Sequence, residues 1–97
     1  MTKVDVERDT HGGLVTISAK GHATGSTEVC AAVSMILYTI AGWLHNHPDI
    51  GSVCRLEDGD ASILYYDRSS ETRTLYEIAK IGFQQLAASY PDYISIG

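Results

Sequence analysis

The sequence predicts an α+β domain with two helices packed on a mostly antiparallel sheet, in the order β-β-α-β-β-α-β. Short stretches that alternate apolar and polar residues occur in pairs around turn residues, which is typical of hairpins. Two longer stretches have the periodicity of helices. Helices that follow hairpins in this way form a layer on an antiparallel sheet.

The first expected hairpin lies at the start of the chain. Residues 4–8 and 14–20 alternate apolar with polar side chains, as half-buried strands do. Residues 9–13 form the turn between them and contain the pair Gly12-Gly13. Because glycine accepts the positive φ angles that tight turns need, we expect these two strands to pair antiparallel.

The first helix is expected where the longest apolar stretch lies, over residues 29–44. Ser26 or Thr27 can cap its start, because a hydroxyl there accepts from the free amides of the first turn. The helix ends near His45, since Pro48 disfavours helical backbone at the residue before it. The stretch is shorter than the roughly 20 residues of a membrane span, so it is interpreted as a buried helix.

A second hairpin is expected over residues 51–57 and 61–67. Asp58-Gly59 between them is a strong signal for a hairpin turn. Cys54 lies in the first of these strands. We expect its thiol to be buried, because cysteine is among the residue types most often found in protein cores.

The second helix is expected from about residue 71 to about residue 89, with caps offered by residues 67–70. Pro91 ends it, and residues 93–96 form a short last strand. Apolar and charged side chains fall on opposite faces at helical spacing. The expected buried face consists of Leu75, Ile78, Ala79, Gly82, Leu86 and Ala87, and the expected exposed face of Arg73, Glu77, Lys80 and Gln84.

Composition narrows the functional class. Ninety-seven residues make one domain, residues 1–97, and dimerisation would add to the thin stability of so small a core. A net charge of −5 argues against a nucleic-acid partner. No apolar run opens the chain, so we expect a cytoplasmic protein with reduced cysteines and no membrane partner. His45 and His47 lack a third ligand at a recognisable spacing, so no metal and no cofactor is predicted.

Cys30 stands near the start of the first helix, where a thiol can become a nucleophile. The reactive form is the thiolate, which a helix N-terminus or a neighbouring imidazole favours. His22 lies eight positions earlier, and Gly21 and Gly25 allow the chain to fold back toward the helix. Free amides of the first turn, that of Cys30 among them, could then stabilise an oxyanion. A small buried core residue is the alternative interpretation.

Two motifs add a resemblance to these observations. Residues 21–23 read Gly-His-Ala, and residues 29–34 read Val-Cys-Ala-Ala-Val-Ser. Near the other end, residues 82–87 read Gly-Phe-Gln-Gln-Leu-Ala and residues 90–94 read Tyr-Pro-Asp-Tyr-Ile. The two motifs resemble those of the ribosomal-processing cysteine protease family, Prp. They occur in the family's order in a chain of about the family's length, so the resemblance covers the whole chain.

The resemblance implies a cytosolic cysteine endopeptidase that works with a Cys–His dyad. Cys30 would be the nucleophile and His22 the general base. Members of the family remove a short N-terminal extension from large-subunit ribosomal protein 27, and they form homodimers. The same resemblance implies that the substrate is the N-terminal peptide of a ribosomal protein or, as in some relatives, of a phage structural protein.

Further residues follow from the resemblance as substrate contacts. They are Gly25 and Thr27 in the loop before Cys30, and Ala31 and Ser34 on the helix. This loop is shorter than is usual in the family, and Thr27 stands where an acidic residue is common. The difference points to a divergent member with another peptide substrate. A catalytically silent module of the same fold, which binds a peptide or protein, is the alternative.

Overall fold

The computed structural model describes residues 1–11, 13–23 and 25–97. Gly12 of the predicted first turn and Thr24 of the predicted loop lie outside the described residues. The predicted element order is confirmed, and one short 3-10 helix is added. The elements are β1 (Thr2–Arg8), β2 (Leu14–Lys20), α1 (Thr27–His45), η1 (Pro48–Ile50), β3 (Ser52–Glu57), β4 (Asp60–Tyr66), α2 (Ser70–Ser89) and β5 (Ile94–Ile96).

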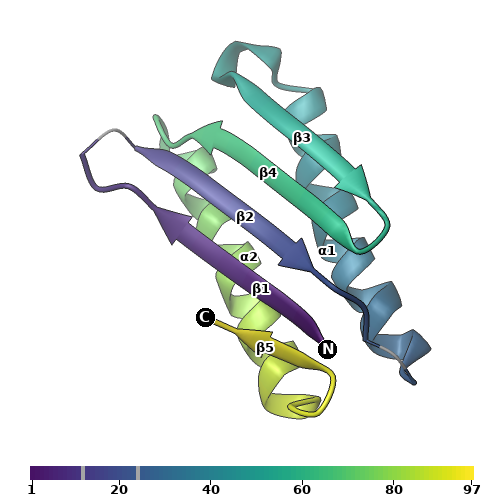
Figure 1. The fold of residues 1–97 in the computed structure, drawn as a ribbon. Coiled ribbons are helices and arrows are strands. Elements are labelled where there is room, and N and C mark those ends of the chain that lie inside the picture. Colours follow the sequence, from purple (N-terminus) through teal and green to yellow (C-terminus); the bar gives the residue numbers. More distant parts are fainter. Residues whose placement is uncertain (12, 24) are drawn as a thin grey trace.

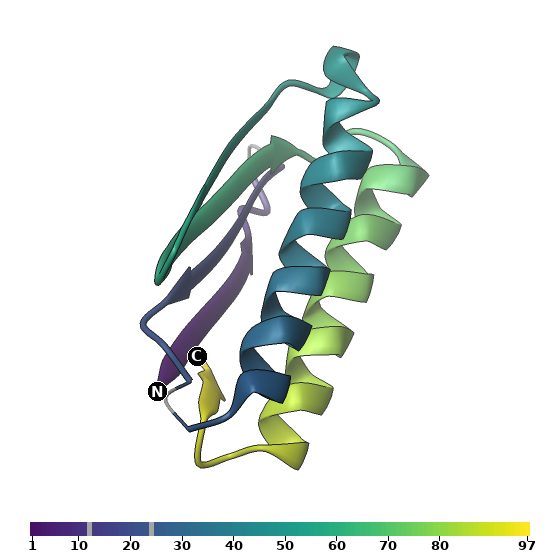
Figure 2. The same ribbon diagram turned by 90° about the vertical axis from the view of Figure 1, so that its right-hand side faces the viewer.

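The five strands form one sheet in the order β3-β4-β2-β1-β5 (Figure 1). Three pairings are antiparallel, β1 with β2, β2 with β4 and β3 with β4, whereas β5 joins β1 in parallel. The sheet is therefore mostly antiparallel, as predicted. Both helices lie on the same face of the sheet, side by side and running in opposite directions (Figure 2).

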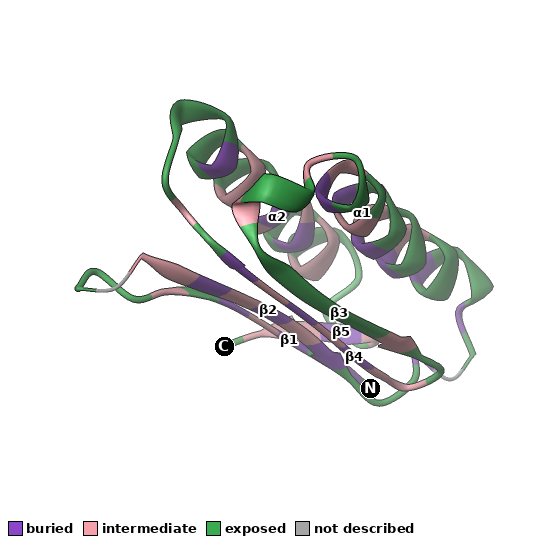
Figure 3. Ribbon diagram, turned by 90° about the horizontal axis from the view of Figure 1, so that it is seen from above, coloured by how far each residue is buried: buried purple, intermediate pink, exposed green. Residues whose placement is uncertain are grey.

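The core lies between the sheet and the two helices. Alternate strand residues such as Val15, Ile17 and Ile63 are fully buried there. Figure 3 shows buried positions on the sides of the helices that face the sheet. By length and composition α1 could also cross a membrane. In this fold it contributes a stripe at three- and four-residue spacing to the core, Val29, Val33, Leu37, Ile40 and Leu44.

The predicted buried face of α2 is partly wrong. Ala79 is buried, but Ile78 is 59% exposed, and Phe83 and Thr72 lie in the core instead. Helical periodicity gives the width of an apolar stripe, but the sheet decides which part of the stripe is covered. The hydroxyl of Thr72 can be buried because it bonds to the cap residue Ser69 and to Asp67.

The prediction of a buried Cys54 is also wrong, since this thiol is exposed. The reason is the place of β3 at the edge of the sheet, where five of its six residues are exposed and only Leu56 is half-buried. Partial desolvation still raises the pKa of the Cys54 thiol. The two cysteines form no disulfide.

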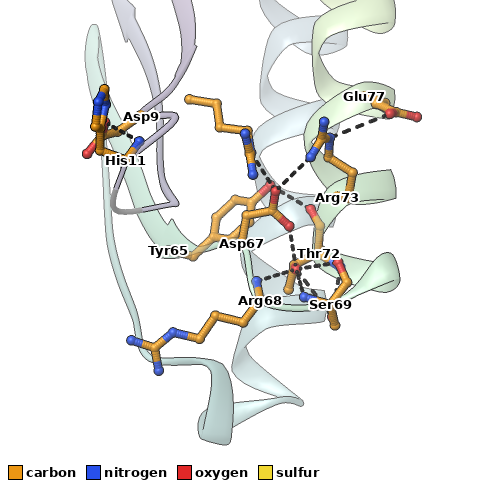
Figure 4. Close-up of polar contacts among 10 residues, drawn as sticks. Asp9, His11, Tyr65, Asp67, Arg68, Ser69, Thr72, Arg73 and Glu77 are labelled. Atoms are coloured by element: carbon orange, nitrogen blue, oxygen red, sulfur yellow. Dashed lines mark hydrogen bonds and ion pairs between the residues drawn. The ribbon is translucent and has the colours of Figure 1, made fainter.

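A buried carboxylate holds the start of α2 against the sheet (Figure 4). The Asp67 side chain is only 4% exposed and accepts hydrogen bonds from Arg8 Nε at 2.6 Å and from Thr72 Oγ1 at 2.9 Å. Burial alone would raise the pKa of Asp67. The Arg8 guanidinium and the Thr72 hydroxyl, with Arg73 at 3.6 Å, outweigh it and keep this pKa below its usual value. Asp67 therefore stays ionised and links β1 to α2.

The Asp67→Asn variant is expected to lose about 2 kcal/mol of the free energy of unfolding, because Arg8 loses its charged partner. Urea denaturation at pH 7 measures the loss. A lowered folded-state pKa means that the stabilisation is complete above the unfolded-state value, about 4, and is lost as the pH falls below it.

The gap between wild type and Asp67→Asn should therefore shrink in acid. Asp60→Asn is the control, because Asp60 pairs with Lys20 and Arg55 at the surface and should matter much less. Equal losses in the two variants, or a gap that persists at the lowest pH, would contradict this account of Asp67.

Candidate active site

Cys30 lies exposed in the second turn of α1. The predicted cap at Ser26 is confirmed, since its Oγ accepts from the Val29 N–H at 3.2 Å. The expectation that the Cys30 amide is free is wrong, because this N–H already donates to the Ser26 carbonyl at 3.3 Å. The amides without an intrahelical partner are those of Thr27 and Glu28, one turn closer to the helix start.

His22 leaves the end of β2 and lies over the turn between β3 and β4. The Gly21 N–H donates to the Gly59 carbonyl at 2.9 Å and ties the end of β2 to this turn. The His22 ring is so close to Gly59 that a Cβ there would lie 2.5 Å from His22 Nε2. On the other side of the ring, Nδ1 lies 3.8 Å from Asp58 Oδ1.

Cys30 and His22 line one cleft of about 190 Å³ between α1 and the β3–β4 turn. Among the described residues, no hydrogen bond joins the Cys30 thiol to the His22 ring. The thiol donates instead to the carbonyl of Ala23, at 3.8 Å. Other residues lining the cleft are Ser34, Tyr38, Leu56, Asp58 and Gly59.

The rim of the cleft is acidic but partly neutralised. The hydrogen bond from Lys20 and the charge of Arg55 hold the pKa of Asp60 below its usual value. Arg55 also bonds Glu57 at 2.7 Å. Asp58, at the tip of the turn, has His22 as its partner. Of the rim carboxylates, Asp58 is therefore the one that pairs with the imidazole of His22.

The structure brings together three of the predicted site residues, Cys30, His22 and Ser34. Ser34 follows Cys30 by one helical turn on the same face, as predicted. Gly25, Thr27 and Ala31 are exposed but are not part of the wall of this cleft. Their contact with a substrate stays a prediction.

Two features of the cleft were missed by sequence reasoning. Tyr38 continues the four-residue spacing of Cys30 and Ser34, and this spacing could have placed it in the cleft. Asp58 and Gly59 were interpreted only as a turn. Their proximity to His22 depends on the pairing of β2 with β4, which no local pattern reveals.

His47 contacts the last turns of α1. Its Nδ1 bonds the Trp43 carbonyl at 2.7 Å, and its ring stacks on the Trp43 ring with centroids 3.8 Å apart. His45 is exposed at the end of α1.

A thiol and an imidazole that line one open cleft are side chains that cysteine hydrolases use. The family model described as cysteine protease Prp matches residues 1–95. The chain therefore belongs to the Prp family of cysteine proteases. Among proteins with curated annotation, none matches the sequence.

Solved structures share the fold over nearly the whole chain. Two are of the essential ribosomal processing protease Prp from S. aureus, one with a covalently linked product peptide and one with a substrate peptide. They are 20% and 18% identical to this chain, each with a TM-score of 0.82, covering 100% of this chain and 98% of the other. SMU.848 from Streptococcus mutans is 24% identical with a TM-score of 0.76, over 99% and 91% of the two chains.

Gly59→Ala is expected to displace the His22 ring, because the new methyl group would stand 2.5 Å from Nε2. The positive φ of 71° also costs about 1 kcal/mol. NMR signals of the His22 ring should shift, and the alkylation rate of Cys30 should change.

Gly51→Ala is a control that separates the backbone strain of a positive φ from the contact with the His22 ring. Its φ of 77° imposes a similar strain, but its methyl group would meet only the Tyr66 ring, at an ordinary 3.9 Å. Both variants should melt at a lower temperature, and only Gly59→Ala should move the His22 signals. Identical His22 signals in the two variants would show that the ring does not rest on Gly59.

Proposed function

We propose that this protein is a cytoplasmic cysteine endopeptidase that removes a short N-terminal extension from large-subunit ribosomal protein 27 or from a similar protein of ribosomal or phage origin. The observation that carries the proposal is the common cleft lined by Cys30 and His22. Membership of the Prp family supports proteolysis. The peptide complexes of the S. aureus protease support a peptide as the ligand.

In the proposed reaction, His22 accepts the proton of the Cys30 thiol, and the sulfur attacks the carbonyl carbon of the scissile peptide bond. The C–N bond then breaks, and His22 returns the proton to the leaving amine. The new N-terminus departs and leaves a thioester on Cys30. Water, deprotonated by His22, attacks the thioester and releases the extension with a free carboxylate.

The helix start and the cleft wall offer groups for the other parts of this reaction. The amides of Thr27 and Glu28, which have no intrahelical partner, are candidates to stabilise the oxyanion. Ser34 and Tyr38 extend the cleft along α1 and can contact the peptide. The acidic rim favours a substrate with basic residues beyond the cut.

A silent binding module is the second candidate, and one observation favours it. The Cys30 thiol bonds the Ala23 carbonyl and not His22, so the thiol and the base are not joined by a hydrogen bond at rest. Such a protein would hold a peptide in the cleft without cutting it.

We propose that a second copy of the chain covers the outer face of the helices. Met35, Ile78 and Ile81 are each more than half exposed there and present on the order of 300 Å² of apolar surface. The smallest stable interfaces bury about 600 Å² per subunit, rather more than half of it apolar. Because α1 and α2 are antiparallel neighbours, a two-fold axis between them would match each helix with its counterpart. A groove of about 610 Å³ between the helices is lined by Met35, Ile36, Trp43, Leu75, Ile78 and Gly82.

Cleavage of a synthetic peptide carrying the ribosomal extension tests the proposed activity. Wild type should cut it, and Cys30→Ala should not. His22→Ala should lower kcat by about 10²- to 10⁴-fold, because it removes the general base. Cys54→Ala removes an exposed thiol outside the cleft and should keep the wild-type rate. An intact peptide after incubation with wild type would rule out ribosomal processing.

Alkylation by iodoacetamide separates the protease from the binding module. Rapid labelling of Cys30 near neutral pH that slows in His22→Ala is expected of the protease. A Cys30 that reacts no faster than an ordinary thiol, in wild type and in His22→Ala alike, would favour the silent module.

Ile78→Glu is expected to dissociate the proposed dimer, because it places two buried charges at the interface. Sedimentation velocity should show the dimer Kd rising at least about a hundredfold. Val53→Glu on the edge strand β3 is the control, with a similarly exposed apolar side chain away from the helices. A monomeric wild type, or equal effects of the two variants, would exclude this interface.

A further inference from the structure

We infer that Asp58 is a positioning residue for His22. Its carboxylate accepts the Nδ1–H of the imidazole, which leaves the lone pair on Nε2 to take the proton of Cys30. The inference rests on the proposed function, in which His22 is the base, and adds a third member to the pair. It is carried by the juxtaposition of the β3–β4 turn with the end of β2.

The first support is the geometry of the turn. Asp58 Oδ1 lies 3.8 Å from His22 Nδ1, a gap that a small rotation of either exposed side chain closes to a hydrogen bond. The backbone beneath is fixed, because the Gly21 N–H donates to the Gly59 carbonyl and Lys20 pairs with Asp60 across the two strands. His22 thus follows directly from a point that is tied to the turn.

Gly59 supplies the second support. A Cβ at this position would stand 2.5 Å from Nε2, 2.9 Å from Cε1 and 3.2 Å from Cδ2 of His22. Because Gly59 has no side chain, the imidazole can lie against the turn, within reach of the Asp58 carboxylate. Asp58 thus offers an acceptor to Nδ1, and Gly59 leaves room for the ring beside that acceptor.

The distribution of charge is the third support. The turn carries three carboxylates, and two of them have cationic partners: Arg55 pairs with Glu57, and Lys20 and Arg55 pair with Asp60. Among the described residues, Asp58 has no cationic partner of this kind and pairs with the His22 imidazole. On the opposing helix, the titratable groups that line the cleft are Cys30 and Tyr38.

The effect on the reaction is expected to be modest. Asp58 is 98% exposed and His22 is 56% exposed, so water screens their interaction. A fixed Nδ1–H tautomer still raises the fraction of enzyme that is ready to accept the proton at Nε2. We therefore expect loss of the Asp58 carboxylate to lower kcat about three- to tenfold, far less than loss of a buried triad aspartate.

The test measures the tautomer of His22 in the protein without substrate. Nitrogen-15 NMR of the imidazole at pH 8 should show that the Nδ1–H fraction falls in Asp58→Ala and returns toward wild type in Asp58→Glu. Asp49→Ala is the matched control, since it removes an exposed carboxylate in η1, away from the cleft. It should leave the tautomer unchanged.

Kinetics on the ribosomal extension peptide complete the test. Asp58→Ala should lower kcat with little change in KM, and Asp58→Glu should restore most of it. An unchanged tautomer ratio in Asp58→Ala would overturn the role of Asp58 even if wild type cuts the peptide. A changed ratio in a protein that leaves the peptide whole would keep the positioning role and overturn the proposed protease.

Discussion

The pairing of β2 with β4 is the constraint on which the rest of this molecule depends. It joins the two hairpins into one sheet, in a register that sets Lys20 opposite Asp60. A shift of β4 by one residue would turn Ile63 away from the helices and move the Asp58-Gly59 turn relative to His22. The same hydrogen bonds that build the core therefore also build the cleft.

Much of this fold follows from local patterns, and the errors lie where distant segments decide. The caps of both helices lie at hydroxyl residues that sequence reasoning proposed, because capping involves neighbours in the chain. The prediction that Cys54 is buried was wrong because an edge strand shows the same alternation of apolar and polar residues as a central strand. The predicted burial of Ile78 was wrong because helical periodicity does not say how far the sheet and the other helix cover the apolar face of α2.

The residues of the candidate site likewise fall into those that local sequence patterns predict and those that only the tertiary structure brings together. Cys30 and His22 stand in a local motif, and the structure places them in one cleft. Ser34 followed from helical spacing. Asp58 is 36 positions beyond His22 in the numbering, so only the register of the sheet brings the two together. The amide of Cys30 was misassigned because the exact first residue of a helix is beyond the resolution of a sequence pattern.

The weakness of the contacts at rest bears on how such a cleft can work. A thiol that donates to a carbonyl at 3.8 Å gains little, and an exposed His–Asp pair gains at most about 1 kcal/mol. A bound peptide that fills the cleft can supply several kcal/mol, which is more than both contacts together. In the proposed reaction, substrate binding would therefore release Cys30 from the Ala23 carbonyl and bring it to His22 at small cost. The β3–β4 turn would hold the imidazole near its working position meanwhile, so that the thiol makes most of the movement.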